Sequence, residues 1–144
     1  MIAGEPMERR HEPGRRHTAA SPCLENDALA LRRFEPEARA LREVRALVRD
    51  LLGGADPTRR AVAELLATEL VTNVLRHAPG GFEVRVRGGD PVRIEVRDSS
   101  RDPPRPRLPD LSCRDGRGML LVARLSISHG WELLEDGKIV WFEL

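Results

Sequence analysis

Glu69 and Asn73 stand four residues apart in a segment, residues 57–78, whose pattern predicts an α-helix. Asp56 precedes the segment as a suitable N-cap, Pro57 suits the first turn, and a Pro-Gly-Gly sequence ends it. Because one helical turn takes about 3.6 residues, the carboxylate and the carboxamide lie one turn apart on the same face. They continue a stripe that otherwise carries apolar residues, beside a second apolar arc.

These two residue types have a shared chemical use. A carboxamide oxygen is a hard, neutral ligand suited to Mg²⁺. A carboxylate one turn away could take the proton of an attacking hydroxyl or water. A glutamate buried in an apolar stripe is costly unless a partner or ligand satisfies it. The helix therefore predicts a functional site around Glu69 and Asn73.

Two further features follow in the chain. Asp98 ends a predicted strand, where its carboxylate can accept a hydrogen bond from an adenine amino group. Gly116 and Gly118 flank Arg117 at the start of a short apolar helix. Paired glycines let backbone N–H groups approach phosphates, and the helix dipole favours negative charge there. Arg117 lies between the glycines and is a candidate phosphate contact.

Each residue also has a structural interpretation. Glu69 could pair with an arginine, and Asn73 could be a hydrogen-bonded amide of the core. His77 could cap or pack the end of its helix. Asp98 could start the turn after its strand, and the glycines could be turn residues. Single motifs of this kind are common, whereas their order and spacing are more specific.

The remaining pattern predicts an α+β fold in two layers. Period-2 alternation and an Asp-Gly turn predict antiparallel strands with one apolar and one charged face, and such a sheet needs helices on only one side. The predicted strands are residues 28–34, 82–87, 92–97, 129–134 and 138–144, and the other predicted helices are 36–52 and 119–125.

The domain organisation is simple. Residues 1–26 show no periodicity and are expected to be a disordered tail. Residues 27–144 are expected to form a single domain, with a long, proline-bearing loop over about 98–115.

Composition narrows the function classes. Lys and Arg total 24 and Asp and Glu total 23, so no charge excess predicts nucleic-acid binding. No apolar run reaches the roughly 20 residues of a membrane span, and the charged N-terminus is unlike a signal peptide. The two cysteines predict neither a disulfide framework nor a metal site. We expect a cytoplasmic protein.

The motifs together resemble the GHKL (Bergerat-fold) ATP-binding domains. The segment from Glu69 to His77 resembles that family's N box. Asp98 matches the position of its adenine-binding aspartate, and Gly116-Arg117-Gly118-Met119-Leu120 resembles its second glycine box. The segment 137–141, Gly-Lys-Ile-Val-Trp, is similar to the closing strand of small actinobacterial members, which resemble anti-sigma-factor serine/threonine kinases.

This resemblance implies a two-layer sandwich with a mixed, mostly antiparallel sheet, and ATP and Mg²⁺ as cofactors. Asn73 would hold Mg²⁺, Asp98 would contact adenine, Glu69 would be the catalytic base, and Gly116 to Gly118 would line the phosphates. His77 and Lys138 would also bind the cofactor. The implied partners are a sigma factor and an anti-anti-sigma protein carrying the accepting serine or threonine. Family members often pair, which leaves both a monomer and a homodimer open.

One departure from the family keeps two alternatives open. The first glycine box usually reads Asp-x-Gly-x-Gly, whereas residues 98–102 read Asp-Ser-Ser-Arg-Asp. The chain could therefore be a binding module of the same fold that grips a regulator with little or no catalysis. The other alternative is an interaction domain whose motifs are coincidental.

Overall fold

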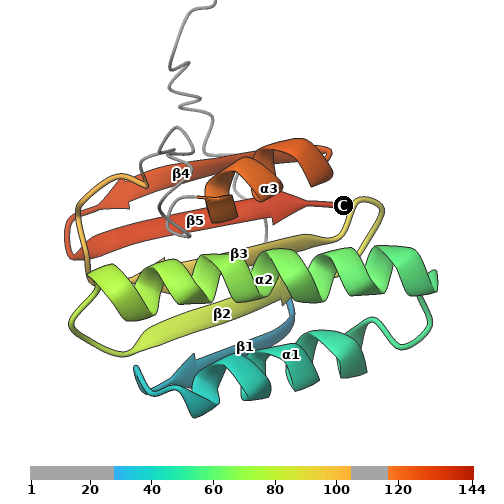
Figure 1. Ribbon diagram of the computed structural model, residues 1–144, viewed down its shortest axis with the longest axis horizontal. Helices are drawn as coiled ribbons and strands as arrows, with labels where there is room; N and C mark the ends of the chain where they lie inside the picture. The colour runs from blue at the N-terminus through green and yellow to red at the C-terminus, as the bar shows by residue number, and fades with distance from the viewer. Residues whose placement is uncertain (1–27, 105–116) are drawn as a thin grey trace, which may run out of the picture.

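The computed structural model describes residues 28–104 and 117–144. The tail predicted to be disordered, 1–26, and Gly116 lie outside these residues. The elements in chain order are β1 (Ala28–Phe34), α1 (Arg39–Leu51), α2 (Pro57–His77), β2 (Phe82–Arg87), β3 (Arg93–Asp98), α3 (Arg117–Leu125), β4 (Ser128–Leu134) and β5 (Gly137–Glu143). The helices of the described chain cover one face of the sheet (Figure 1).

The sheet has the strand order β1-β2-β3-β5-β4, and each neighbouring pair in the described chain is antiparallel. The predicted α+β fold of two layers is confirmed. The sheet differs from the mixed one that the resemblance implied. The chain passes through α3 to the edge strand β4, and the tight turn at Asp136 then returns β5 antiparallel between β4 and β3.

Helix α2 is the central helix of the covering layer, and its start agrees with the sequence. Asp56 Oδ2 accepts a hydrogen bond from the backbone N–H of Arg59 at 3.0 Å, so the predicted N-cap is confirmed. The second apolar arc meets the core, because its residues Ala63, Ala67, Leu70, Val71 and Val74 are buried, and so is Leu66 of the first stripe. Glu69 and Asn73 are half-buried. They therefore lie at the border of the core, so Glu69 is less buried than its stripe predicted.

Helix α1 begins later than predicted. It starts at Arg39 rather than at Pro36, and no side chain caps Ala38 at its N-terminus. Its apolar side faces the core as expected, with Val44, Leu47 and Val48 buried. Neither α1 nor any other helix of the described chain is long and apolar enough to cross a bilayer.

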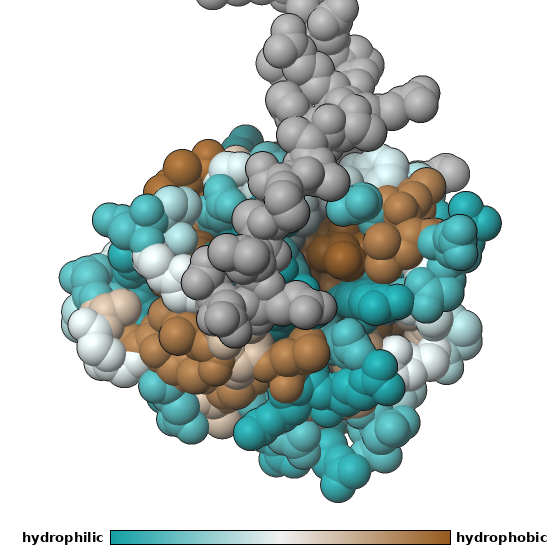
Figure 2. All heavy atoms as spheres, turned by 180° about the vertical axis from the view of Figure 1, so that it is seen from behind, coloured by the Kyte–Doolittle hydropathy of each residue, from teal (hydrophilic) through white to brown (hydrophobic). Residues whose placement is uncertain are grey.

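Strands β2 and β3 have the two faces that their alternation predicted. Phe82, Val84 and Val86 are buried under the helices, as are Ile94 and Val96. The alternate residues carry charges on the opposite face, which no helix of the described chain covers (Figure 1). Figure 2 views the molecule from this side and shows hydrophilic side chains interspersed with apolar ones. We call this side the open face.

Candidate functional site

A cavity of about 310 Å³ lies where α2 passes over β3 and β5. Its apolar wall comes from α2 and the two strands, and its polar groups come from all three elements and the segment after β3. The lining residues are Leu70, Asn73, Val74, His77, Val96, Asp98, Asp102, Pro103, Pro104, Lys138 and Val140. A hollow that combines an apolar wall with a few convergent polar groups is typical of a small-molecule site.

The cavity brings together four residues that the sequence singled out. Asn73 and His77 lie one turn apart near the C-terminal end of α2, with Asn73 half-buried and His77 exposed. Asp98 ends β3, and Lys138 lies opposite it in β5. These residues come from three elements separated by up to 65 positions, so only the fold places them together.

The polar end of the cavity is a buried ion pair. Lys138 Nζ lies 2.9 Å from Asp98 Oδ1, and the side chains of the two residues are 8% and 2% exposed. The ammonium also donates to the carbonyl oxygen of Ser100 at 3.3 Å. A buried carboxylate is costly when it is alone, and Lys138 supplies the opposite charge beside Asp98.

The segment after Asp98 closes without the glycines of the family motif. The backbone N–H of Ser100 donates to Asp98 Oδ1 at 2.7 Å, and that of Asp102 donates to Ser100 Oγ at 3.2 Å. Such side-chain bonds stabilise a turn locally. Strand β5 packs closely against the backbone at Asp98. A Cβ on Gly137 would overlap the Asp98 carbonyl oxygen, so this position of β5 requires glycine. Gly137 thus lets β5 lie against the backbone of Asp98 and Ser99.

Glu69 lies outside the set of residues that line the cavity. A Cβ built on Gly118 would come 2.5 Å from Glu69 Oε2, so the carboxylate lies directly against the start of α3. No cation of the described residues is within ion-pair distance of it. Arg117, the first residue of α3, is exposed and does not line the cavity either. Gly118 therefore contacts Glu69 and does not line the cavity.

Sequence reasoning missed the contact between Lys138 and Asp98, and it missed the lining by Asp102 and the two prolines after it. A signal for Lys138 is present in β5. Lys138, Val140 and Phe142 alternate on one face of the strand, and all three are buried. A lysine in phase with core residues is predicted to point inward, and a buried lysine needs an anionic partner.

The oxygen atoms that the cavity offers are suited to binding a nucleotide together with magnesium. Asn73 offers a carboxamide oxygen, and Asp98 offers a carboxylate oxygen at the inner end. The described residues contain no cluster of three or more His, Cys, Asp or Glu side chains that could hold a metal alone. Mg²⁺ in proteins is commonly held by one or two protein oxygens together with phosphates and water. A single amide ligand is consistent with that coordination.

Comparison with known proteins agrees with this geometry. Residues 34–144 match the family model of the histidine kinase-like ATPase domain. Among solved structures, the chain matches the crystal structure of the RsbU and RsbW domains of Rv1364c from Mycobacterium tuberculosis, with a TM-score of 0.57 and 18% identity. The match covers 79% of this chain and 32% of that one. A search of curated protein sequences gives no match.

At this identity the structural match shows a common fold, and the family match extends over the helix, the strand end and the closing strand that build the cavity. The chain belongs to the histidine kinase-like ATPase (GHKL) domain family.

Proposed function

We propose that the protein is an ATP- and Mg²⁺-binding regulator that acts as an anti-sigma-factor-like serine/threonine kinase. The observation that carries the proposal is the cavity in which Asn73 of α2 meets Asp98 of β3. Asp98 would accept a hydrogen bond from the adenine amino group. The carboxamide oxygen of Asn73 would be a ligand of Mg²⁺, and His77 lies one turn further along α2 in the cavity lining.

Glu69 is the proposed catalytic base. The serine or threonine hydroxyl oxygen of a partner protein forms a bond to the γ-phosphorus, and Glu69 accepts its proton. The bond between that phosphorus and the β,γ-bridging oxygen breaks, and ADP leaves with the oxygen. Bound Mg²⁺ neutralises phosphate charge in this reaction. The Glu69 carboxylate lies against Gly118, one of the two proposed phosphate-binding glycines, and this contact supports the proposed role.

The proposed partners are a sigma factor and an anti-anti-sigma protein that carries the accepting hydroxyl. Two observations support them: the sequence motifs resemble anti-sigma-factor kinases, and the matched solved structure contains a domain named RsbW. The family match alone supports only the nucleotide-binding part of the proposal.

The direct test mixes the protein with Mg-ATP and candidate anti-anti-sigma proteins, and follows phosphate on serine or threonine. Glu69→Gln keeps the shape of the side chain and removes the base. We expect it to lower phosphoryl transfer about 100-fold or more, because general-base catalysis contributes about 10²–10⁴, while ATP affinity changes little.

Glu64→Gln is the matched control. Glu64 lies on the same helix but pairs with Arg49 of α1, far along the helix from the cavity residues. We expect its phosphoryl transfer to equal that of the wild type. Near-normal transfer by Glu69→Gln would disprove the assigned role of this glutamate.

A binding module without catalysis is the second candidate. Two observations favour it: Ser99 and Ser100 replace the usual glycines, and the Glu69 carboxylate does not line the cavity. A thermal shift with Mg-ATP separates the cases in part. Ligand at 100 times its dissociation constant adds about 2.7 kcal/mol of stability. Stabilisation without transfer to any partner supports a binding module, and both together support the kinase.

A further inference from the structure

Within residues 28–104 and 117–144, the Lys138 ammonium at the inner end of the cavity has two hydrogen-bond acceptors and one donor without a partner. An ammonium group has three N–H donors. Two of them are engaged, one by Asp98 Oδ1 at 2.9 Å and one by the Ser100 carbonyl at 3.3 Å. Lys138 is 7% exposed and lines the cavity. The remaining donor is thus buried beside the hollow, where a ligand is the natural acceptor.

Asp98 has the complementary property. Its Oδ1 accepts from Lys138 and from the Ser100 backbone, which uses both lone pairs of that oxygen. No donor of the described residues reaches Oδ2, although Asp98 is 4% exposed and lines the same cavity. The inner end of the cavity therefore presents one acceptor and one donor next to each other.

An adenine ring presents the matching pattern on one edge. Its 6-amino group is a donor, and the adjacent ring nitrogen N1 is an acceptor. We propose that Lys138 is a base-recognition residue that donates to adenine N1 while Asp98 Oδ2 accepts from the 6-amino group. This inference rests on the proposed function and adds the residue that makes the site specific for adenine.

The same arrangement disfavours guanine. In the pose that suits adenine, guanine presents an acceptor at position 6 and a donor at N1, so both contacts become unfavourable. A reversed pose would direct two guanine donors, N1–H and the 2-amino group, at the Asp98 carboxylate, whose Oδ1 already accepts two hydrogen bonds. A buried donor left without an acceptor is costly. The preference for adenine over guanine therefore depends on the hydrogen bonds that occupy Asp98 Oδ1 within the protein as well as on the hydrogen bonds to the base.

Charge points the same way. Asp98 and Lys138 form a pair with no net charge, so a neutral base can replace water at this end without leaving a buried charge uncompensated. If Lys138 were only a structural partner of Asp98, its third donor would contribute nothing to binding. The distinction is measurable with modified bases.

The test compares Mg-ATP with Mg-1-deaza-ATP, in which N1 is replaced by C–H, by titration calorimetry on the full chain. Mg-7-deaza-ATP keeps N1 and the 6-amino group and is the matched ligand control. We expect 1-deaza-ATP to bind at least about tenfold more weakly than ATP, because a bond from a charged donor is lost. The affinity of 7-deaza-ATP should stay close to that of ATP.

The variant Lys138→Met should bring the ratio of the ATP and 1-deaza-ATP affinities to about one. If Lys138→Met does not fold, Asp98→Asn/Lys138→Met avoids an unpaired buried charge, keeps an acceptor for the 6-amino group, and should give the same ratio. Arg93→Met removes a cation from the open face and should leave the wild-type ratio unchanged.

Equal affinities for ATP and 1-deaza-ATP in the wild type, or an unchanged ratio without Lys138, would overturn the role of Lys138 and leave the proposed function standing. Absence of any Mg-ATP binding would instead overturn both.

Discussion

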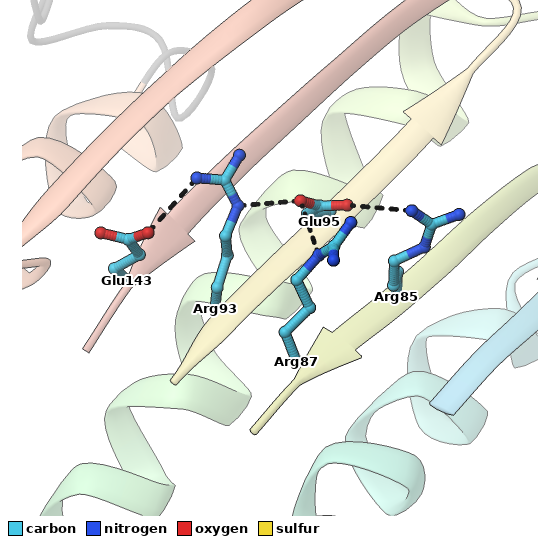
Figure 3. A network of polar contacts seen from close by, with 5 residues as sticks. All are labelled: Arg85, Arg87, Arg93, Glu95 and Glu143. Atoms are coloured by element: carbon cyan, nitrogen blue, oxygen red, sulfur yellow. Dashed lines mark hydrogen bonds and ion pairs between the residues drawn. The ribbon is translucent and has the colours of Figure 1, made fainter. Parts of the chain in front are cut away.

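Strand β3 carries two buried carboxylates, three residues apart, in opposite surroundings. Glu95 points to the open face and is 7% exposed; Asp98 points under the helices and is 4% exposed. Figure 3 shows Glu95 among Arg85, Arg87 and Arg93. The distances are 3.8 Å from Arg85, 3.3 Å from Arg87 and 2.8 Å from Arg93, and they engage both oxygens of Glu95.

The two clusters differ in what they leave free. Each oxygen of Glu95 has a cation, and Arg93 also reaches Glu143 and lies 3.8 Å from the centre of the Trp141 ring. Among the described residues, Asp98 has one cation, on one oxygen, and it lines a cavity. Burial and charge alone would rank the two carboxylates together. Arg87 Nη1 in the Glu95 cluster is buried and has no hydrogen-bond partner in the described chain, but it does not line the cavity. The comparison shows that a binding site is recognised by an unused donor or acceptor that also faces a hollow.

The largest expected effect separates the two clusters by stability. Lys138→Met leaves Asp98 as an uncompensated buried charge, so we expect a loss of about 3–5 kcal/mol. Arg93→Met leaves two arginines near Glu95, and we expect a loss of about 1–2 kcal/mol. Urea unfolding of both variants without nucleotide measures the difference. Equal losses would mean that the two carboxylates are held in the same way.

Removing both partners sharpens the first result. In Asp98→Asn/Lys138→Met no buried charge is left unpaired, so most of the stability should return, to within about 1–2 kcal/mol of the wild type. A double-mutant cycle with Asp98→Asn and Lys138→Met as the single variants gives the coupling energy. Strict additivity of the two single variants would contradict the ion pair as a unit.

Gly118→Ala tests the position of the Glu69 carboxylate, and its main effect is expected on phosphoryl transfer rather than on stability. The new methyl group would lie 2.5 Å from Glu69 Oε2 and must displace that carboxylate. We expect phosphoryl transfer to fall about tenfold to 100-fold through misplacement of the base, with stability changed by less than about 1 kcal/mol because alanine favours the helix. Gly54→Ala is the control, since nothing lies within 4 Å of its Cβ. Unchanged transfer in Gly118→Ala would argue against this placement of the base.

The smallest expected effect concerns an ion pair between the helices α1 and α2, away from both carboxylate clusters of β3. Arg49 of α1 bonds both oxygens of Glu64 of α2, at 3.1 and 2.8 Å. The hydrogen bond from Arg49 and its charge hold the pKa of the Glu64 carboxyl below its usual range. A lowered folded-state pKa stabilises the protein above the ordinary glutamate pKa, about 4.3, and this contribution is lost as the pH falls through the folded-state pKa.

Unfolding of the wild type and Glu64→Gln across that pH range measures the contribution. We expect the wild type to be slightly more stable at neutral pH and the two curves to converge in acid. The Arg49 side chain is 58% exposed, so solvent screens the pair, and the difference should be much smaller than that for Lys138. A difference that grows on acidification would contradict the sign.

The local sequence pattern was enough to predict most of the helices and strands. The alternation in β2 and β3 and the Asp56 cap are decided within a few residues, and the structure confirms them. The hairpin between β4 and β5 is confirmed too, but its turn is residues 135–136, one position earlier than the predicted Asp136-Gly137, because Gly137 pairs with Leu134. The start of α1 was wrong by three residues, because Pro36 begins a bend rather than a first turn. The site was predictable only in part. Asn73 and Asp98 do line one cavity, whereas Glu69 lies beside Gly118 outside its lining.

The sequence by itself determined the fold class, the position of the central helix and the residue types available for nucleotide chemistry, because periodicity and caps act over short distances along the chain. The tertiary structure alone decided that Lys138 pairs with Asp98 and that Gly137 packs against the backbone at Asp98. It also decided that, among the described residues, both oxygens of Glu95 have cations whereas only one oxygen of Asp98 does. Those outcomes depend on strand register and on which side chains share a hollow. They are set by contacts between residues up to 40 positions apart, and no local pattern encodes them.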